Sequence, residues 1–177
     1  GKHAGMLATC VINGWPIDSY LDPSHPLQLA IKAEVEQMSG ESVAGVSVDG
    51  CGAPLFLFSL LGLARAIRNL TISTDPVHQE VAQACRDYPE MVSGPGRLAT
   101  RMMQNIPGLF MKDGAEAVNV ASLPDGRTSA IKISDGNARA MPAITAAVLA
   151  QFGIDAHEVP VNTLGAGLPV GIIRATF

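Results

Sequence analysis

The sequence predicts an α+β fold in which an antiparallel sheet is flanked by helices. Helical apolar patterns fill the first 107 residues, strand-like segments follow Gly108, and the turn Pro124–Arg127 joins two of these strands as a hairpin. This order differs from the regular strand–helix alternation of a parallel sheet. We therefore expect a mainly helical part over residues 1–107 and a sheet-forming part with one helix over residues 108–177. The two parts are expected to share one core.

Four segments of the first part have the apolar spacing of amphipathic helices. Gly14 and Gly40 stop the first two, Asp75 caps the third ahead of a proline, and Pro107 stops the fourth. The expected helices cover residues 3–14, 26–38, 74–88 and 97–106.

Between the second and third of these helices, residues 43–50 are expected to form a short strand that leads into the loop Asp49–Gly52. Pro54 suits the first turn of a helix, so a helix is expected to follow it. Because residues 55–67 are apolar nearly all round, this helix should be buried on most faces.

The second part contains the segments that should form the sheet. Strands are expected near residues 109–122 and 127–134, then a helix that ends at Gly153, and a final strand from Pro169 to the end of the chain. Glu116 should lie at the start of a strand whose side chains face inward.

Composition and charge exclude several classes of function. A net charge of −4 gives no electrostatic reason to expect nucleic acid or an anionic membrane as a partner. The most apolar run is too short to span a bilayer and is interrupted by Arg65. The 3 cysteines, without CxxC spacing, argue against a disulfide framework and favour a cytoplasmic location.

Cys51 is a candidate site residue because glycines flank it on both sides. The partial positive charge of the helix expected at Pro54 would favour its thiolate, which is a nucleophile or a metal ligand. The alternative is a turn whose small residues let a strand and a helix pack closely. Asp49 has the same two interpretations, as a turn former or as a hydrogen-bond acceptor that orients a ligand.

Two lysines are further candidates. Lys2 and His3 lie at the foot of the first helix, where they form either part of a site or a solvated surface pair. Lys112 follows two apolar residues and could be partly desolvated, which favours a neutral amine that acts as a base. The alternative for Lys112 is an edge-strand lysine that discourages edge pairing. Ser129 and Lys132 match a Ser-x-x-Lys pair, but on a strand their side chains point to opposite faces.

Taken together and in order, these motifs resemble the bacterial asparaginase II family, the thermolabile and inducible type. The resemblance runs from Gly1 to the last strand and so covers essentially the whole chain. It rests on GKHAGM, GWP with Tyr20, His25-Pro26-x-Gln28, DGCGAP, SGPGR-x-x-T, K-x-GAE, and DG-x-x-RA with Asp135 and Arg139.

The resemblance implies a fold like that of serine β-lactamases and glutaminases and an activity that converts L-asparagine into L-aspartate and ammonia. It implies serine–lysine acyl transfer with Lys112 as a catalytic lysine, and a zinc site that includes Lys2 and Cys51. We expect a homodimer. The residues expected to bind substrate are His3, Asp49, Gly114, Ala115 and Glu116.

The chain also departs from the family pattern. The family's Cys-Ser before the Gly-Lys, and its nucleophilic serines, are missing, and Ala117 replaces the second glycine of GAEG. We therefore expect a C-terminal portion that is incomplete at its N-terminus and inactive in isolation. Two alternatives stay open: a non-catalytic fragment or homologue that binds asparagine or aspartate, and a zinc-dependent amidase. The shortage of histidine and carboxylate ligands argues against the amidase.

Overall fold

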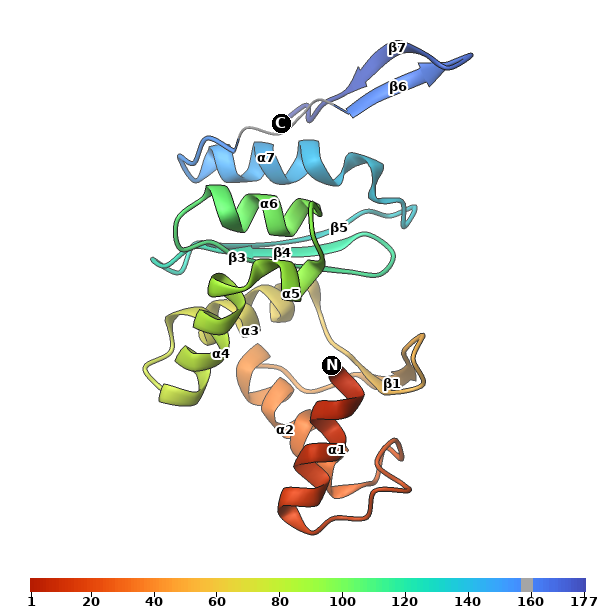
Figure 1. The fold of residues 1–177 in the computed structure, drawn as a ribbon, viewed down its shortest axis with the longest axis vertical. Coiled ribbons are helices and arrows are strands. Elements are labelled where there is room, and N and C mark those ends of the chain that lie inside the picture. The colour runs from red at the N-terminus through yellow and green to blue at the C-terminus, as the bar shows by residue number, and fades with distance from the viewer. Residues whose placement is uncertain (157–160) are drawn as a thin grey trace. The chain divides into compact units, whose positions relative to one another are not determined.

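A computed structural model of the protein, which describes residues 1–156 and 161–177, confirms the α+β fold with antiparallel sheets (Figure 1). The chain divides into two compact units, Gly1–Ala66 and Ile67–Phe177, and helix α3 (Leu60–Ile72) spans their boundary. This division differs from the one expected at residue 107. The reason is that helix α6 (Leu98–Asn105) packs on the sheet that follows it and so belongs with that sheet.

The first unit begins with the two expected helices, α1 (Lys2–Asn13) and α2 (Pro26–Ser39). Each ends at a glycine in the left-handed region, a backbone conformation that costs a glycine little, with φ of 66° at Gly14 and 71° at Gly40. The buried cluster between the helices consists of Met6, Cys10, Leu27 and Ala53.

The segment after the Cys51 loop is a strand, so the helix expected from Pro54 is wrong in its start. β1 (Gly45–Val48) and β2 (Pro54–Leu57) form an antiparallel hairpin with Val48 opposite Pro54. Proline is tolerated at the first residue of a strand as well as in the first turn of a helix, so it did not distinguish the two.

Helix α3 begins later, at Leu60, directly after a serine whose side chain caps its first turn. The Ser59 hydroxyl accepts a hydrogen bond from the Gly62 N–H at 2.9 Å, which satisfies one free donor of the first turn. The Glu41 carboxylate in turn accepts the Ser59 hydroxyl at 2.9 Å. The expected burial is also wrong, since Leu60 and Leu61 are 44% and 58% exposed.

The second unit contains a three-stranded antiparallel sheet in the order β3-β4-β5, formed by β3 (Phe110–Gly114), β4 (Val118–Ser122) and β5 (Thr128–Lys132). The expected hairpin turn is confirmed, because the Leu123 N–H donates to the Arg127 carbonyl at 2.9 Å. The helices are α4 (Pro76–Asp87), α5 (Pro89–Ser93), α6, the 3-10 turn η1 (Ala138–Ala140) and α7 (Met141–Gln151).

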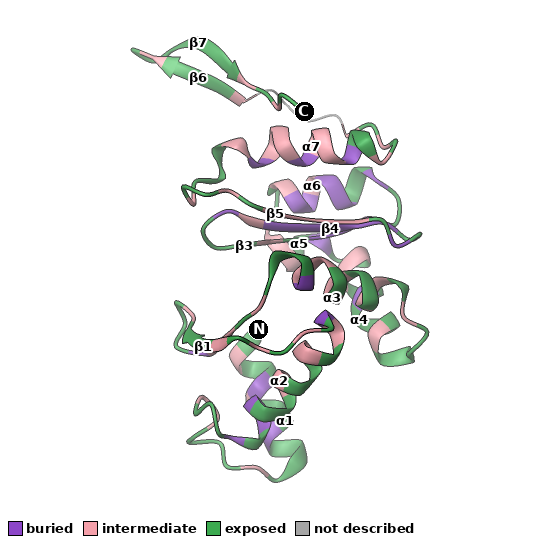
Figure 2. Cartoon of the chain, turned by 180° about the vertical axis from the view of Figure 1, so that it is seen from behind, coloured by how far each residue is buried: buried purple, intermediate pink, exposed green. Residues whose placement is uncertain are grey.

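Helices α6 and α7 lie on one side of this sheet, and α4 lies on the other (Figure 1). The buried residues gather on β4 and α6 (Figure 2). They form one cluster around Met111, which is fully buried, and Leu149 of α7. The opposite face of β3 carries Lys112, because neighbouring residues of a strand point to opposite faces.

The last strand of the chain does not join this sheet. β7 (Leu168–Ile173) pairs with β6 (Val161–Gly165) as a separate antiparallel hairpin, most of whose residues are exposed (Figure 2). No helix within residues 1–156 and 161–177 is long and apolar enough to cross a membrane.

Candidate functional site

The first unit brings Lys2, His3, Asp49 and Cys51 together. α1 presents Lys2 at its start, and the β1–β2 turn presents Asp49, whose carboxylate accepts the Lys2 ammonium at 2.5 Å. This contact lowers the pKa of Asp49 and, with the nearby Cys51, raises the pKa of Lys2. Lys2 and Asp49 therefore form an ion pair at neutral pH. Its side chains are 50% and 40% exposed, so it contributes little to folding stability.

Cys51 is exposed at the tip of the β1–β2 turn, and its thiolate is stabilised by three neighbours. The backbone N–H of Ala53, and then Lys2 and His3, lower the pKa of Cys51 to about 7. The helix start that we expected to stabilise the thiolate is absent, because Pro54 begins a strand. The lowered pKa of Cys51 is instead caused by the backbone amide of Ala53 and the ammonium of Lys2.

His3 is positioned by the loop between α1 and α2, which hydrogen bonds stabilise. Its Nδ1 hydrogen-bonds the Tyr20 hydroxyl at 2.7 Å, and the buried Gln28 amide donates to the Tyr20 carbonyl at 2.7 Å. His25 accepts the Leu27 N–H through Nδ1, so its Nε2–H donates to the Pro16 carbonyl at 2.9 Å. The HP-x-Q motif therefore supports the loop, and Tyr20, to which the sequence analysis gave no role, positions His3.

The other candidate residues lie in the second unit, on the β3–β4 hairpin. Lys112 is on the edge strand β3 opposite Val120, and its ammonium donates to the Asp113 carbonyl oxygen. Its side chain is 50% exposed, so about half of it is shielded from solvent. Asp113 also accepts Ser93 at 2.8 Å, which ties the strand to the end of α5.

Gly114 ends β3, Ala115 and Glu116 lie in the turn that follows, and all three residues are exposed. Glu116 lies in this turn and not in an inward-facing strand, which corrects the expectation. Its carbonyl accepts the Lys132 ammonium at 2.7 Å. Glu116 and Ala117 have φ of 55° and 57°, a region that suits glycine, so Ala117 is strained where the family pattern has glycine.

Within the described residues, no group of three or more His, Cys, Asp and Glu side chains is placed to hold a metal ion. Of the two expected zinc ligands, Cys51 favours its thiolate, but Lys2 favours its ammonium, which has no lone pair for a metal. The described residues therefore do not form a complete zinc site.

Thiol labelling of the metal-free protein should modify Cys51 first, with a rate that rises as the pH passes about 7. Cys10 is fully buried, and burial raises the pKa of Cys85, so both should react more slowly. Replacing Lys2 with Met should slow Cys51 labelling at pH 7 by roughly two- to tenfold. Mass spectrometry of the labelled peptides measures all three rates, and equal labelling of the three thiols would contradict this description of the turn.

Comparison with protein families gives one match. A model of the L-asparaginase II family matches residues 1–167 and so includes both groups of candidate residues. No curated protein matches the chain.

Proposed function

Since the chain belongs to the L-asparaginase II family, we propose that it provides the catalytic lysine of an amidohydrolase that converts L-asparagine into L-aspartate and ammonia. The observation that carries the proposal is the family match across the K-x-GAE segment. Lys112 fits this role because its side chain is half exposed on a sheet edge, where a substrate and a partner residue can approach it.

In the proposed reaction a serine hydroxyl attacks the side-chain carbonyl carbon of asparagine, and Lys112, as the neutral amine, takes the hydroxyl proton. The C–N bond then breaks, and the lysine returns the proton to the leaving nitrogen, which departs as ammonia. Water hydrolyses the resulting ester by the same proton transfers in reverse, which releases aspartate and restores the serine.

The serine is proposed to lie outside these 177 residues. The single Ser-x-x-Lys of the sequence, Ser129 to Lys132, lies on β5, where the two side chains point to opposite faces. Lys132 is also engaged by the carbonyls of Glu116 and Ile133. This observation favours a second candidate function, in which the isolated chain binds asparagine or aspartate without turnover.

Substrate binding is assigned to Gly114, which ends the strand of Lys112, and to Ala115 and Glu116 in the exposed turn that follows. The backbone N–H groups of this turn could hold a developing oxyanion, and the Glu116 carboxylate could hold the substrate ammonium. His3 and Asp49 are also proposed as substrate-binding residues. We also propose a homodimer in the cytoplasm.

A zinc ion is proposed as a structural element only, with Cys51 and a deprotonated Lys2 among its ligands. Such an ion would hold the β1–β2 turn against the start of α1, and the proposed proton transfers do not pass through it. A zinc-dependent amidase is the alternative mechanism.

Hydroxylamine trapping tests the acyl-transfer mechanism in a full-length protein. Because hydroxylamine competes with water for the acyl ester, we expect aspartyl hydroxamate to form from asparagine, also after treatment with a chelator. The colour of the iron–hydroxamate complex measures the product. Loss of all ammonia release on chelation, restored by zinc and without hydroxamate, would favour the zinc-dependent amidase.

A further inference from the structure

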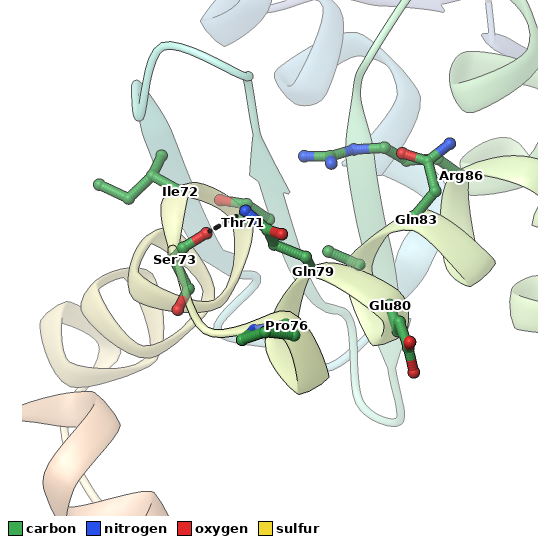
Figure 3. A pocket seen from close by; sticks show the side chains of 9 residues that line it. Thr71, Ile72, Ser73, Pro76, Gln79, Glu80, Gln83 and Arg86 are labelled. Atoms are coloured by element: carbon green, nitrogen blue, oxygen red, sulfur yellow. Dashed lines mark hydrogen bonds between the residues drawn. The ribbon is translucent and has the colours of Figure 1, made fainter.

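A pocket of about 630 Å³ lies in the second unit between the end of α3 and α4 (Figure 3). Four of its nine lining residues have neutral polar side chains. Thr71 and Ser73 line it from α3 and the following loop, and Gln79 and Gln83 line it from α4. The charged residues of its lining are Glu80 and Arg86.

Arg86 has no hydrogen-bond partner in the described residues for two of its nitrogen atoms, Nε and Nη2, although both are buried. Burial also lowers the pKa of the guanidinium. A buried donor without an acceptor destabilises a fold, and the cost is greater for a charged group. Unpartnered buried donors at the wall of a pocket indicate that a bound ligand supplies the missing acceptor.

The other polar groups of the pocket are already engaged. The Gln79 amide donates to the Ser73 carbonyl at 3.2 Å, and the Gln83 amide donates to Asp87 at 2.7 Å. The Thr71 hydroxyl donates to the Arg68 carbonyl and contacts the Ser122 hydroxyl at 2.7 Å. Arg86 differs from these residues, because two of its nitrogen atoms are buried and have no partner among the described residues.

The view into the pocket agrees with this assignment. The guanidinium of Arg86 extends from α4 across the pocket toward Thr71, whereas the Glu80 side chain points away from it (Figure 3). Nε and Nη2 are buried in this rotamer, so binding of an acceptor requires a change of rotamer that turns this edge of the guanidinium into the pocket.

We propose that this pocket binds a small carboxylate monoanion through Nε and Nη2 of Arg86. These two nitrogen atoms lie on one edge of the planar guanidinium, where their parallel N–H groups match the two oxygens of a carboxylate. A single cation, with Glu80 in the same lining, suits a monoanion better than a phosphate dianion. The inference does not depend on Lys112 or on amide hydrolysis.

Binding of propionate, compared with propionamide and inorganic phosphate, tests the proposal on the 177-residue chain. NMR titration of the Arg86 Nε–H signal should show propionate binding at least about tenfold tighter than its uncharged amide, because hydrogen bonds to charged groups are the strong ones. Replacing Arg86 with Met should weaken propionate binding by about tenfold or more, read from backbone amide shifts of α4. Arg86→Lys, which keeps the charge but loses the paired donors, should bind with intermediate affinity.

Arg139→Met is the matched control, because Arg139 pairs with Asp135 at 2.7 Å and does not line the pocket. Its propionate affinity should stay within about twofold of the original. The Arg86→Met variant should also unfold at a higher temperature than the original chain, since it removes a buried charge without a partner. Equal affinity for propionate and propionamide, tighter binding of phosphate, or unchanged propionate binding in Arg86→Met would overturn the proposal.

Discussion

Replacing Lys112 with Met in a full-length protein should lower kcat/KM for L-asparagine by about a hundredfold to ten-thousandfold. A general base typically contributes this much to a reaction rate, and Met keeps most of the side-chain stem while it removes the amine. Because the side chain is half exposed and its ammonium contacts the neighbouring Asp113, the melting temperature should change little. Steady-state ammonia release and thermal unfolding, measured on the same preparation, separate loss of chemistry from loss of fold.

Lys32→Met is the matched control, since Lys32 is a partly exposed lysine of α2 that pairs with Glu36 at 3.6 Å. Its activity should stay within about twofold of the original. A drop of less than about tenfold in Lys112→Met would assign Lys112 to the alternative role, an edge-strand lysine that discourages pairing.

The isolated 177-residue chain should fold and yet release no ammonia from L-asparagine. Folding is expected because each unit has its own buried cluster, around Cys10 in the first unit and around Met111 in the second. Turnover is not expected because the described residues place no serine beside Lys112 as a hydrogen-bond partner. Circular dichroism reports the fold, and a coupled ammonia assay reports turnover.

Most of the helices could be predicted from the sequence, because their ends carry strong local signals. Gly14, Gly40 and the Asp75-Pro76 cap lie where the structure has helix ends, and the Pro124–Arg127 turn joins two paired strands. Such signals act within a few residues, so they survive without knowledge of the tertiary fold.

The region around Pro54 could not be predicted in the same way. Its apolar run suits a buried helix or a strand, and the pairing with β1 decided for the strand. The hydroxyl of Ser59 caps the first turn of α3 and marks where this helix begins. Pro54 alone could not show this, because the strand after it depends on its pairing with residues 45–48.

Part of the candidate site could be located from the sequence. The flanking glycines selected Cys51 and the family resemblance selected Lys2, and the structure brings these two residues together although 49 positions separate them. Arg86 carried no signal, because an arginine in the last turn of a helix is usually a favourable surface residue. Only the burial of its unpartnered nitrogen atoms distinguishes it.

Ammonia release from a mixture of this chain and a separately expressed segment that contains the proposed serine tests the central claim most directly. The claim is that these residues supply the lysine of the reaction and that the nucleophilic serine lies elsewhere. We expect no activity from either piece alone, activity from the mixture, and none when the chain carries Lys112→Met. Ammonia release from the isolated chain, lost in its own Lys112→Met variant, would contradict the account and place the nucleophile within these 177 residues.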